Sequence, residues 1–296
     1  MIKIDNIKVP LDYDDLVIKN ILEKKLKDKI IDFKIHKRAI DARNDNVIFN
    51  MSFLVNLKNE AKHKGLIYKP KKPLVVPKST NKSVVIVGSG PAGLFNALIL
   101  IEAGLKPIII ERGKDVAGRE HDIDELLKNK KLNKDSNFVY GIGGAGTYSD
   151  GKLTTNINSE YNSFVLETFV KFGADPDILV DSKPHIGTDV LKKIVANMTD
   201  YINSFGHIYF NHTFVDIMDK KIKCINEDKE VYFDFDYLVL AIGHSPKETF
   251  KMLYDKGLEM EAKPFSMGVR IEHKQELINK IQYGKFYNNK NLPHAT

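Results

Sequence analysis

The chain of 296 residues contains a single cysteine, Cys224, so it can form neither an intrachain disulfide nor a Cys-x-x-Cys pair. Chemistry that relays electrons through a catalytic dithiol needs two thiols and is excluded. No apolar run approaches the roughly 18 residues of a membrane helix, and Met1 to Asp15 has acidic residues but no apolar stretch typical of a signal peptide. We therefore expect a cytoplasmic protein that does not contact a membrane.

The excess of one charge sign is small. The chain has 45 Lys and Arg against 39 Asp and Glu, a net charge of +6, and the two signs alternate along its length. The densest basic stretch, Lys69 to Lys78, is interrupted by prolines, which is typical of a solvated linker. We expect no nucleic-acid partner, and 43% hydrophobic residues indicate a globular chain with a sizeable core.

The N-terminal residues 1–57 are predicted to form a small α+β module. Ile2, Ile4 and Ile7 open a strand, residues 12–27 have helical periodicity, and apolar residues alternate from Val47 to Leu57. Residues 58–82, rich in Lys and Pro, are predicted to be a linker.

An α/β domain is predicted over residues 83–255, with a helical insertion around 157–205. It opens with a strand–helix–strand unit: strand 83–88, helix 91–103 and strand 106–111. Helices are expected at 162–172 and 189–204, a three-stranded meander at 207–215, 221–226 and 230–235, and a strand at 237–242. Residues 256–296, in which Phe265, Met267, Val269 and Ile271 alternate with other residues, are predicted to begin a mixed-sheet substrate domain.

The first turn of this unit carries the motif Gly88-Ser89-Gly90-Pro91-Ala92-Gly93. Gly88 permits a tight turn, Gly90 lets the backbone approach a pyrophosphate, and Gly93 allows close helix–sheet packing. The N-terminus of the following helix offers N–H groups to phosphates. Glu111 ends the next strand, where a carboxylate can accept hydrogen bonds from a ribose and disfavours a 2′-phosphate. The motif alone leaves NAD and FAD open, and NADP is not expected here.

A second glycine cluster runs from Gly141 to Lys152. Gly146 to Lys152 matches a nucleotide-binding P-loop, but Leu153 stands where a magnesium-binding Ser or Thr is required, so we reject that interpretation. The row of small residues is better suited to let backbone N–H groups approach a flat ring such as a flavin. The alternative is a flexible surface loop.

Segment Gly88 to Glu111 resembles the FAD fingerprint of glutathione-reductase type. Five further motifs resemble the bacterial family of uncharacterised FAD-dependent dehydrogenases: Lys37–Arg43, Gly143–Leu153, Lys183–Asp189, Gly243–Ser245 and Lys263–His273. The resemblance implies a Rossmann-like FAD-binding domain that holds FAD non-covalently. It further implies Glu111 on the adenosine ribose, Gly143 to Gly146 near the isoalloxazine and Val215 in backbone contact with adenine.

The expected cofactor-binding residues come from both glycine clusters and from the ends of neighbouring strands. They are Gly88, Ser89, Gly90, Pro91, Ala92, Gly93, Glu111, Arg112, Gly143, Gly144, Ala145, Gly146, Val215, Ala241 and Gly243. The candidates for contact with the flavin or the substrate are Lys152, His185, His244 and Arg270. For each of these four, an ordinary exposed side chain or loop residue is the alternative. The nine histidines show no metal-ligand spacing, and no metal site is expected.

These observations predict an FAD-dependent oxidoreductase, a dehydrogenase that transfers hydride between a small-molecule substrate or NAD(P)H and FAD. No second Gly-x-Gly-x-x-Gly motif is present, so NAD(P)H would bind only transiently. The chain departs from the family's pattern because it has no Gly-Asp dipeptide and stops at Thr296, where relatives continue. The alternative is therefore a truncated, non-catalytic subunit, a fragment or split-gene product that needs a complementing C-terminal polypeptide. An NAD-dependent dehydrogenase is the third possibility.

Overall fold

The computed structural model describes all residues except 44, 45, 59, 71, 72, 80, 150, 154, 156, 266, 270 and 296. It divides into two compact units. Unit 1 comprises Met1–Lys72, Pro176–Pro184 and Pro264–Thr296, and unit 2 comprises Pro73–Asp175 and His185–Lys263.

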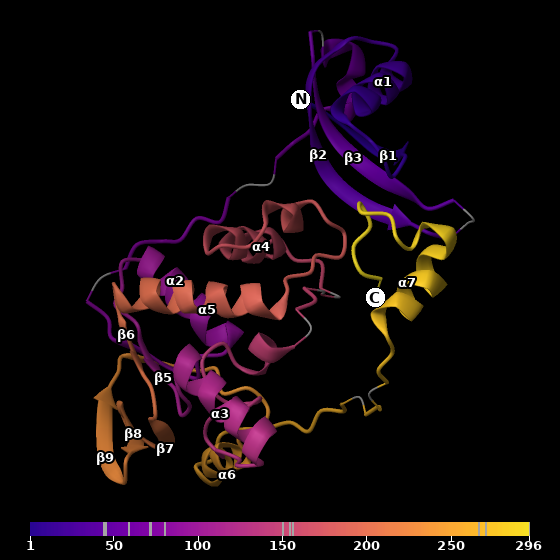
Figure 1. Cartoon of the computed structure of the whole chain (residues 1–296). Coiled ribbons are helices and arrows are strands. Elements are labelled where there is room, and N and C mark those ends of the chain that lie inside the picture. The colour runs from indigo at the N-terminus through magenta and orange to yellow at the C-terminus, as the bar shows by residue number, and fades with distance from the viewer. Residues whose placement is uncertain are drawn as a thin grey trace. The chain divides into compact units, whose positions relative to one another are not determined.

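Unit 1 is built on a three-stranded antiparallel sheet with the order β1-β3-β2 (Figure 1). The strands are β1 (Ile2–Val9), β2 (Ile30–Asp41) and β3 (Ile48–Leu57). Helix α1 (Asp15–Leu26) is capped by Asp14, whose carboxylate accepts from the N–H of Val17 at 2.7 Å, and it buries Ile18 and Leu22 in the core of the sheet. The predicted helix and the strands at both ends of the module are confirmed, whereas β2 was not predicted.

The segment 264–296 contributes to the same core. It forms α7 (Gln275–Tyr283) and the short 3-10 helix η4 (Gly284–Phe286), and Tyr283 and Ala295 are buried with the residues of the sheet. The strand predicted at the start of this segment is wrong, because the described residues of 256–296 contain no strand. That these residues begin a substrate domain stays a prediction. The alternating side chains there are 72–88% exposed; they are Phe265, Met267, Val269 and Ile271. An alternating pattern makes a strand only where a neighbouring strand supplies hydrogen bonds and a surface to cover.

Residues 176–184 also belong to unit 1, although they lie within the predicted helical insertion. They include the 3-10 helix η3 (Pro176–Leu179) and are held by Arg38 of β2. The Arg38 guanidinium donates to Asp177 and Asp181 at 2.7 Å each, and its backbone N–H donates to the carbonyl of Val180. A short insertion is thereby fixed to a strand more than a hundred residues earlier.

Unit 2 contains a parallel sheet with the strand order β10-β4-β5-β6. The strands are β4 (Val84–Val87), β5 (Ile108–Ile110), β6 (His207–Tyr209) and β10 (Tyr237–Leu240). The helices are α2 (Pro91–Glu102), α3 (Val116–Asn129), α4 (Asn162–Lys171), α5 (Thr188–Asn203) and α6 (Lys247–Asp255). The predicted strand–helix–strand unit and both later helices are confirmed, and the sheet is that of a Rossmann-like α/β domain.

The predicted single strand 207–215 is wrong, because the chain turns at Asn211, whose φ is 58°. Its first part is β6, and its second part begins an antiparallel sheet of β7 (Thr213–Met218), β8 (Lys221–Asn226) and β9 (Lys229–Asp234). Phe214, Ile222, Cys224 and Phe233 of the antiparallel sheet pack in one core with Val85, Val87 and Ile110.

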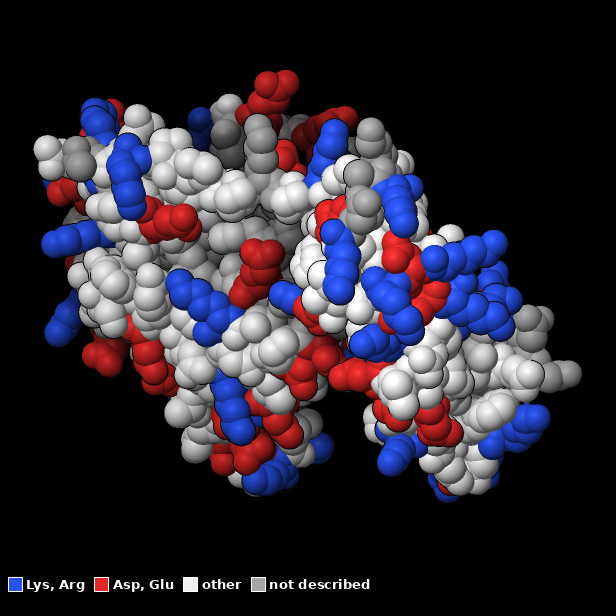
Figure 2. All heavy atoms as spheres, turned by 90° about the horizontal axis from the view of Figure 1, so that it is seen from above, with Lys and Arg blue, Asp and Glu red and all other residues white. Residues whose placement is uncertain are grey.

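Lys and Arg side chains lie among Asp and Glu side chains on the face of the molecule that Figure 2 shows. Among the residues that the structure describes, no helix is both long enough and apolar enough to cross a membrane.

Candidate functional site

The candidate site lies at the carboxyl edge of the parallel sheet, where open α/β folds bind ligands. The residues that directly follow three neighbouring strands, β10, β4 and β5, lie there: Ala241, Gly88 and Glu111. Hydrogen bonds continue past the strand ends: Ala241 donates to the carbonyl of Val87, and Gly88 donates to that of Ile110, both at 2.8 Å. The predicted residues at the ends of β4, β5 and β10 are therefore brought side by side.

Gly88 and Gly93 have the steric roles expected from the motif. Gly88 has a φ of +102°, and a Cβ on it would lie 2.3 Å from the carbonyl oxygen of Ala241. A Cβ on Gly93 would lie 1.9 Å from the carbonyl oxygen of Gly88. The turn and the first helical residues, with Gly90 as N-cap and Pro91 at N1, thus pack as closely as the backbone allows.

The Glu111 carboxylate is buried and already accepts four hydrogen bonds. One oxygen accepts from the N–H and the hydroxyl of Ser89 at 3.0 and 2.5 Å. The other accepts from the N–H groups of Gly113 and Gly141 at 2.8 and 3.2 Å. Two carboxylate oxygens offer about four lone-pair sites. In this arrangement Glu111 ties the first glycine loop to the second, and its predicted bond to a ribose stays a prediction.

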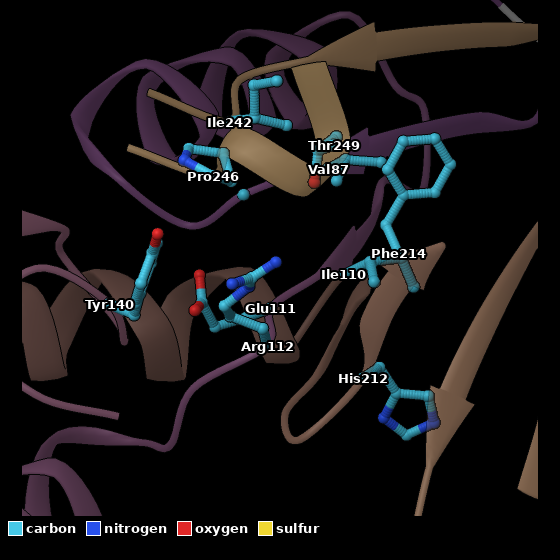
Figure 3. A pocket seen from close by; sticks show the side chains of 11 residues that line it. Val87, Ile110, Glu111, Arg112, Tyr140, His212, Phe214, Ile242, Pro246 and Thr249 are labelled. Carbon is cyan, nitrogen blue, oxygen red and sulfur yellow. The ribbon is translucent and has the colours of Figure 1, made fainter. Parts of the chain in front are cut away.

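A pocket of about 60 Å³ opens beside Gly88 and Glu111 (Figure 3). Its lining combines apolar side chains with a few polar groups, as is typical of ligand sites. The lining residues are Val87, Gly88, Ile110, Glu111, Arg112, Tyr140, His212, Phe214, Ile242, Pro246 and Thr249. The motif predicted Gly88, Glu111 and Arg112, whereas the other polar and aromatic members come from segments that carry no sequence signature.

Arg112 and Tyr140 also line a neighbouring open cleft of about 840 Å³. The Arg112 guanidinium lies 4.6 Å from the centre of the Tyr140 ring and pairs with Glu248 at 2.6 Å. Val215, the predicted adenine contact, lines this cleft and not the smaller pocket, where its neighbour Phe214 lies. Residues on a strand alternate between faces, so one position decides which cavity a side chain enters.

Sequence reasoning missed Arg119, which is fully buried. Its guanidinium donates to five main-chain carbonyls, those of Asn137, Phe138, Gly141, Ile142 and Gly144, at 2.6 to 3.2 Å. A Cβ on Gly141, whose φ is +116°, would lie 2.5 Å from Cδ of Arg119. Burial lowers the pKa of Arg119, while the nearby Tyr148 and Glu111 oppose that shift. Arginine is usually exposed, so no pattern marks this one as buried.

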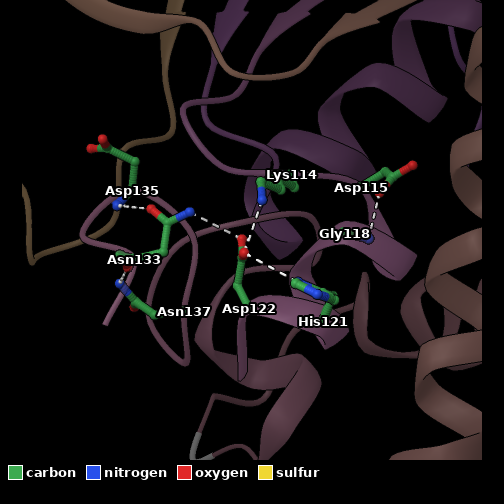
Figure 4. A network of polar contacts seen from close by, with 8 residues as sticks. All are labelled: Lys114, Asp115, Gly118, His121, Asp122, Asn133, Asp135 and Asn137. Atoms are coloured by element: carbon green, nitrogen blue, oxygen red, sulfur yellow. Dashed lines mark hydrogen bonds and ion pairs between the residues drawn. The ribbon is translucent and has the colours of Figure 1, made fainter. Parts of the chain in front are cut away.

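The beginning of the same loop is held by Asp122 (Figure 4). Its carboxylate accepts from Lys114 at 2.8 Å and from the side-chain amide of Asn133 at 3.1 Å. Asn133 in turn accepts from the N–H of Asp135 and from the amide of Asn137. Burial is the largest single influence and opposes ionisation of Asp122. The hydrogen bonds from Lys114, Ser136 and His121 and the charge of Lys114 together outweigh it and leave the pKa of Asp122 below its usual value of 3.8.

Two of the candidate contact residues are brought together. Lys152 and His185 face one another in an isolated antiparallel bridge, and the N–H of Ile186 donates to the carbonyl of Gly151 at 2.8 Å. Both side chains are exposed. His244 is exposed in the segment between β10 and α6, and Arg270 lies outside the described residues. The roles of these four residues stay predictions.

The glycine motif lies in a segment that matches a known protein family. Residues 81–119 match the FAD binding domain family, and residues 264–296 match the family described as FAD-dependent protein, C-terminal domain-like. Residues 1–56 match a domain of unknown function, DUF8436. The cofactor is FAD. FAD is thus the one of the two dinucleotides, NAD and FAD, that the motif left open. The contacts of Gly88 and Glu111 with it stay predictions.

A curated relative, named "Uncharacterized protein", comes from Clostridium beijerinckii. It is 42% identical over 316 aligned positions, which cover 99% of this chain and 58% of that protein. This chain thus spans little more than half the length of the relative.

Solved structures that are similar share less than a fifth of the aligned residues. THI4 from Thermovibrio ammonificans is 16% identical with a TM-score of 0.39, covering 60% of this chain and 64% of that chain. The 3-ketosteroid-Δ4-(5α)-dehydrogenase from Rhodococcus jostii RHA1 is 12% identical with a TM-score of 0.36, covering 56% and 48%.

Proposed function

We propose that this chain is an FAD-dependent oxidoreductase, a dehydrogenase that moves hydride between a small-molecule substrate or NAD(P)H and its flavin. The observation that carries the proposal is the match of residues 81–119 to the FAD binding domain on a sheet edge built for a dinucleotide. When bound, FAD supplies the redox chemistry, since its ring accepts and returns hydride.

The chain's own residues bind and orient the cofactor. The N-terminus of α2, with Gly90 as its N-cap, offers N–H groups to the diphosphate. The pocket and the neighbouring cleft beside Glu111 and Arg112 offer surfaces for the adenosine half. Donors for the flavin or the substrate come from Lys152 and His185, whose loops are joined by an antiparallel bridge, and from His244 after β10. The substrate class follows from none of these groups.

The proposal is tested first by the absorbance of freshly purified protein between about 300 and 550 nm, with identification of any flavin released on denaturation. We expect a yellow protein, or a colourless one that turns yellow with added FAD, and bleaching of the flavin band by a donor under anaerobic conditions. A colourless chain that ignores FAD and shows NAD-dependent turnover would instead support the NAD-dependent dehydrogenase.

A second candidate function is supported by the exposed segment before α7. There Phe265, Met267 and Val269 are 82–88% exposed, which is unusual for three large apolar side chains at alternate positions of one segment. We propose as the alternative that a complementing C-terminal polypeptide adds to this segment and completes the flavin site, so that the present chain alone does not turn over.

This alternative is tested by co-expression with the part of the Clostridium beijerinckii protein that this chain does not cover. The alternative predicts a stable complex with higher FAD occupancy than either piece alone. A triple Ser variant of Phe265, Met267 and Val269 should abolish the complex, whereas Leu16→Ser, exposed on α1, should not. FAD bound and reduced fully by the present chain alone would exclude it.

A further inference from the structure

The buried Arg119 is a cation surrounded by main-chain carbonyls, and this arrangement fixes the direction of the peptides that it holds. A trans peptide is planar, so its N–H points away from its own C=O. The carbonyl of Gly144 is held by Nη1 of Arg119 at 2.9 Å. The N–H of Ala145 therefore points away from Arg119. Ala145 itself is exposed, unlike Gly141, Ile142 and Gly143 before it.

The second glycine loop lies directly against the first. A Cβ on Gly144 would be 3.1 Å from Cα of Gly90 and 3.4 Å from Cδ of Pro91. These two residues are the N-cap and first residue of α2, a helix of 12 residues. In addition, the N–H of Gly143 donates to the carbonyl of Ser89 at 2.9 Å. The outward N–H of Ala145 and the N–H groups at the start of α2 thus belong to one surface.

We propose that Arg119 is a positioning residue for a diphosphate-binding loop, and that the Ala145 N–H which it orients is a donor to the diphosphate of FAD. The inference rests on the proposed function and names the part of the cofactor that the loop serves. It differs from the contact with the isoalloxazine that the family resemblance implies for Gly143 to Gly146. Glu111 supports the arrangement because it accepts from Ser89 in the first loop and from Gly141 in the second.

Ala145→Pro is the sharpest variant, because proline deletes this one N–H and is tolerated at the first position of a helical turn. Ala145→Ser keeps the N–H and is the matched control. We expect Ala145→Pro to weaken binding of FAD and of ADP by the same factor, about tenfold, the loss typical of a hydrogen bond to a charged group. ADP shares the diphosphate with FAD but lacks the flavin, so equal losses identify the diphosphate side.

Arg119→Met and Arg119→Lys test the orienting role. Both variants should weaken the binding of FAD and of ADP by the same factor, and by a larger factor than Ala145→Pro. The loss should be smaller for Arg119→Lys than for Arg119→Met, because lysine keeps the charge but not the five contacts. Lys192→Met is the control variant. Lys192, like Arg119, is a cation that lies over the Tyr148 ring, at 4.9 Å, but it donates to Glu120 rather than to the loop. Thermal melting of each free protein separates loss of folding from loss of binding.

A fall in FAD affinity with unchanged ADP affinity in Ala145→Pro would overturn the proposal in favour of the isoalloxazine side. Unchanged affinity for both ligands would also overturn it while leaving the proposed function intact. A wild-type chain that binds neither FAD nor ADP would remove the proposed function, and this inference with it.

Discussion

Glu111 shows how one side chain can organise two loops. Its four hydrogen bonds come from Ser89, Gly113 and Gly141, so this one carboxyl group is an acceptor that both glycine loops share. Glu111→Gln should destabilise unit 2 by about 1–3 kcal/mol, because an amide has one acceptor oxygen and would turn its NH₂ group toward backbone donors. Denaturant unfolding measures this loss. Glu125→Gln is the control: Glu125 is half-buried on α3, its carboxylate accepts from the side-chain amide of Asn129, and the change should have little effect.

Cys224 is expected to be chemically inert in the folded protein. It is fully buried in β8 between the two sheets of unit 2, and burial raises the pKa of its thiol to about 12. The reactive thiolate is therefore scarce at neutral pH. A maleimide should label native protein only at the rate of unfolding and denatured protein within the mixing time. Rapid labelling of the native chain would show that this core opens.

At the scale of elements, the loop that follows α3 is held at its start by Asp122 and further on by Arg119. Asp122→Asn should loosen residues 133–144 and raise their hydrogen exchange, since Lys114 and Asn133 lose their shared carboxylate. Asp124→Asn is the matched control, two residues along the same helix, because the exposed Asp124 pairs with exposed Lys128 and not with the loop. Equal exchange in both variants would contradict the anchoring role.

The same contacts set a pH dependence for this loop. The pKa of Asp122 in the folded state is below its usual 3.8, so its stabilisation is complete above that value and is lost as the pH falls through the folded pKa. The protection factors of residues 133–144, which are corrected for the intrinsic pH dependence of exchange, should therefore stay constant from neutral pH down to about 4 and fall below it. In Asp122→Asn this acid-dependent step should be absent.

The whole molecule consists of two units with separate cores, one around β1, β2 and β3 and one around the parallel sheet. Calorimetry should resolve two transitions. FAD should raise the free energy of unfolding of unit 2 alone, by about 2.7 kcal/mol at a hundredfold excess over its dissociation constant, and so raise the melting temperature of that transition. Arg38→Met should lower only the transition of unit 1, because Arg38 holds residues 176–184 there. A single transition shifted by both changes would contradict this division.

Local signals in the sequence predicted much of this protein. The alternating residues of β3, the helical periodicity of α1, α4 and α5, and the unit from β4 to β5 all follow from spacing, because burial of one face imposes that spacing. The Gly88 motif and Glu111 lie together at the carboxyl edge of the parallel sheet, as their spacing predicted, and the FAD cofactor is confirmed by the family match.

Other features depend on partners far away in the chain, and only the tertiary structure decided them. Strand β2 has few buried side chains and becomes a strand because β3 pairs with it, and the turn at Asn211 divides a run that is locally uniform. Arginine is a residue type that is usually exposed, yet Arg119 is buried, because the fold brings together five carbonyls that accept its hydrogen bonds. Short-range patterns encode faces and turns, whereas which surfaces meet is fixed by the packing of the complete chain.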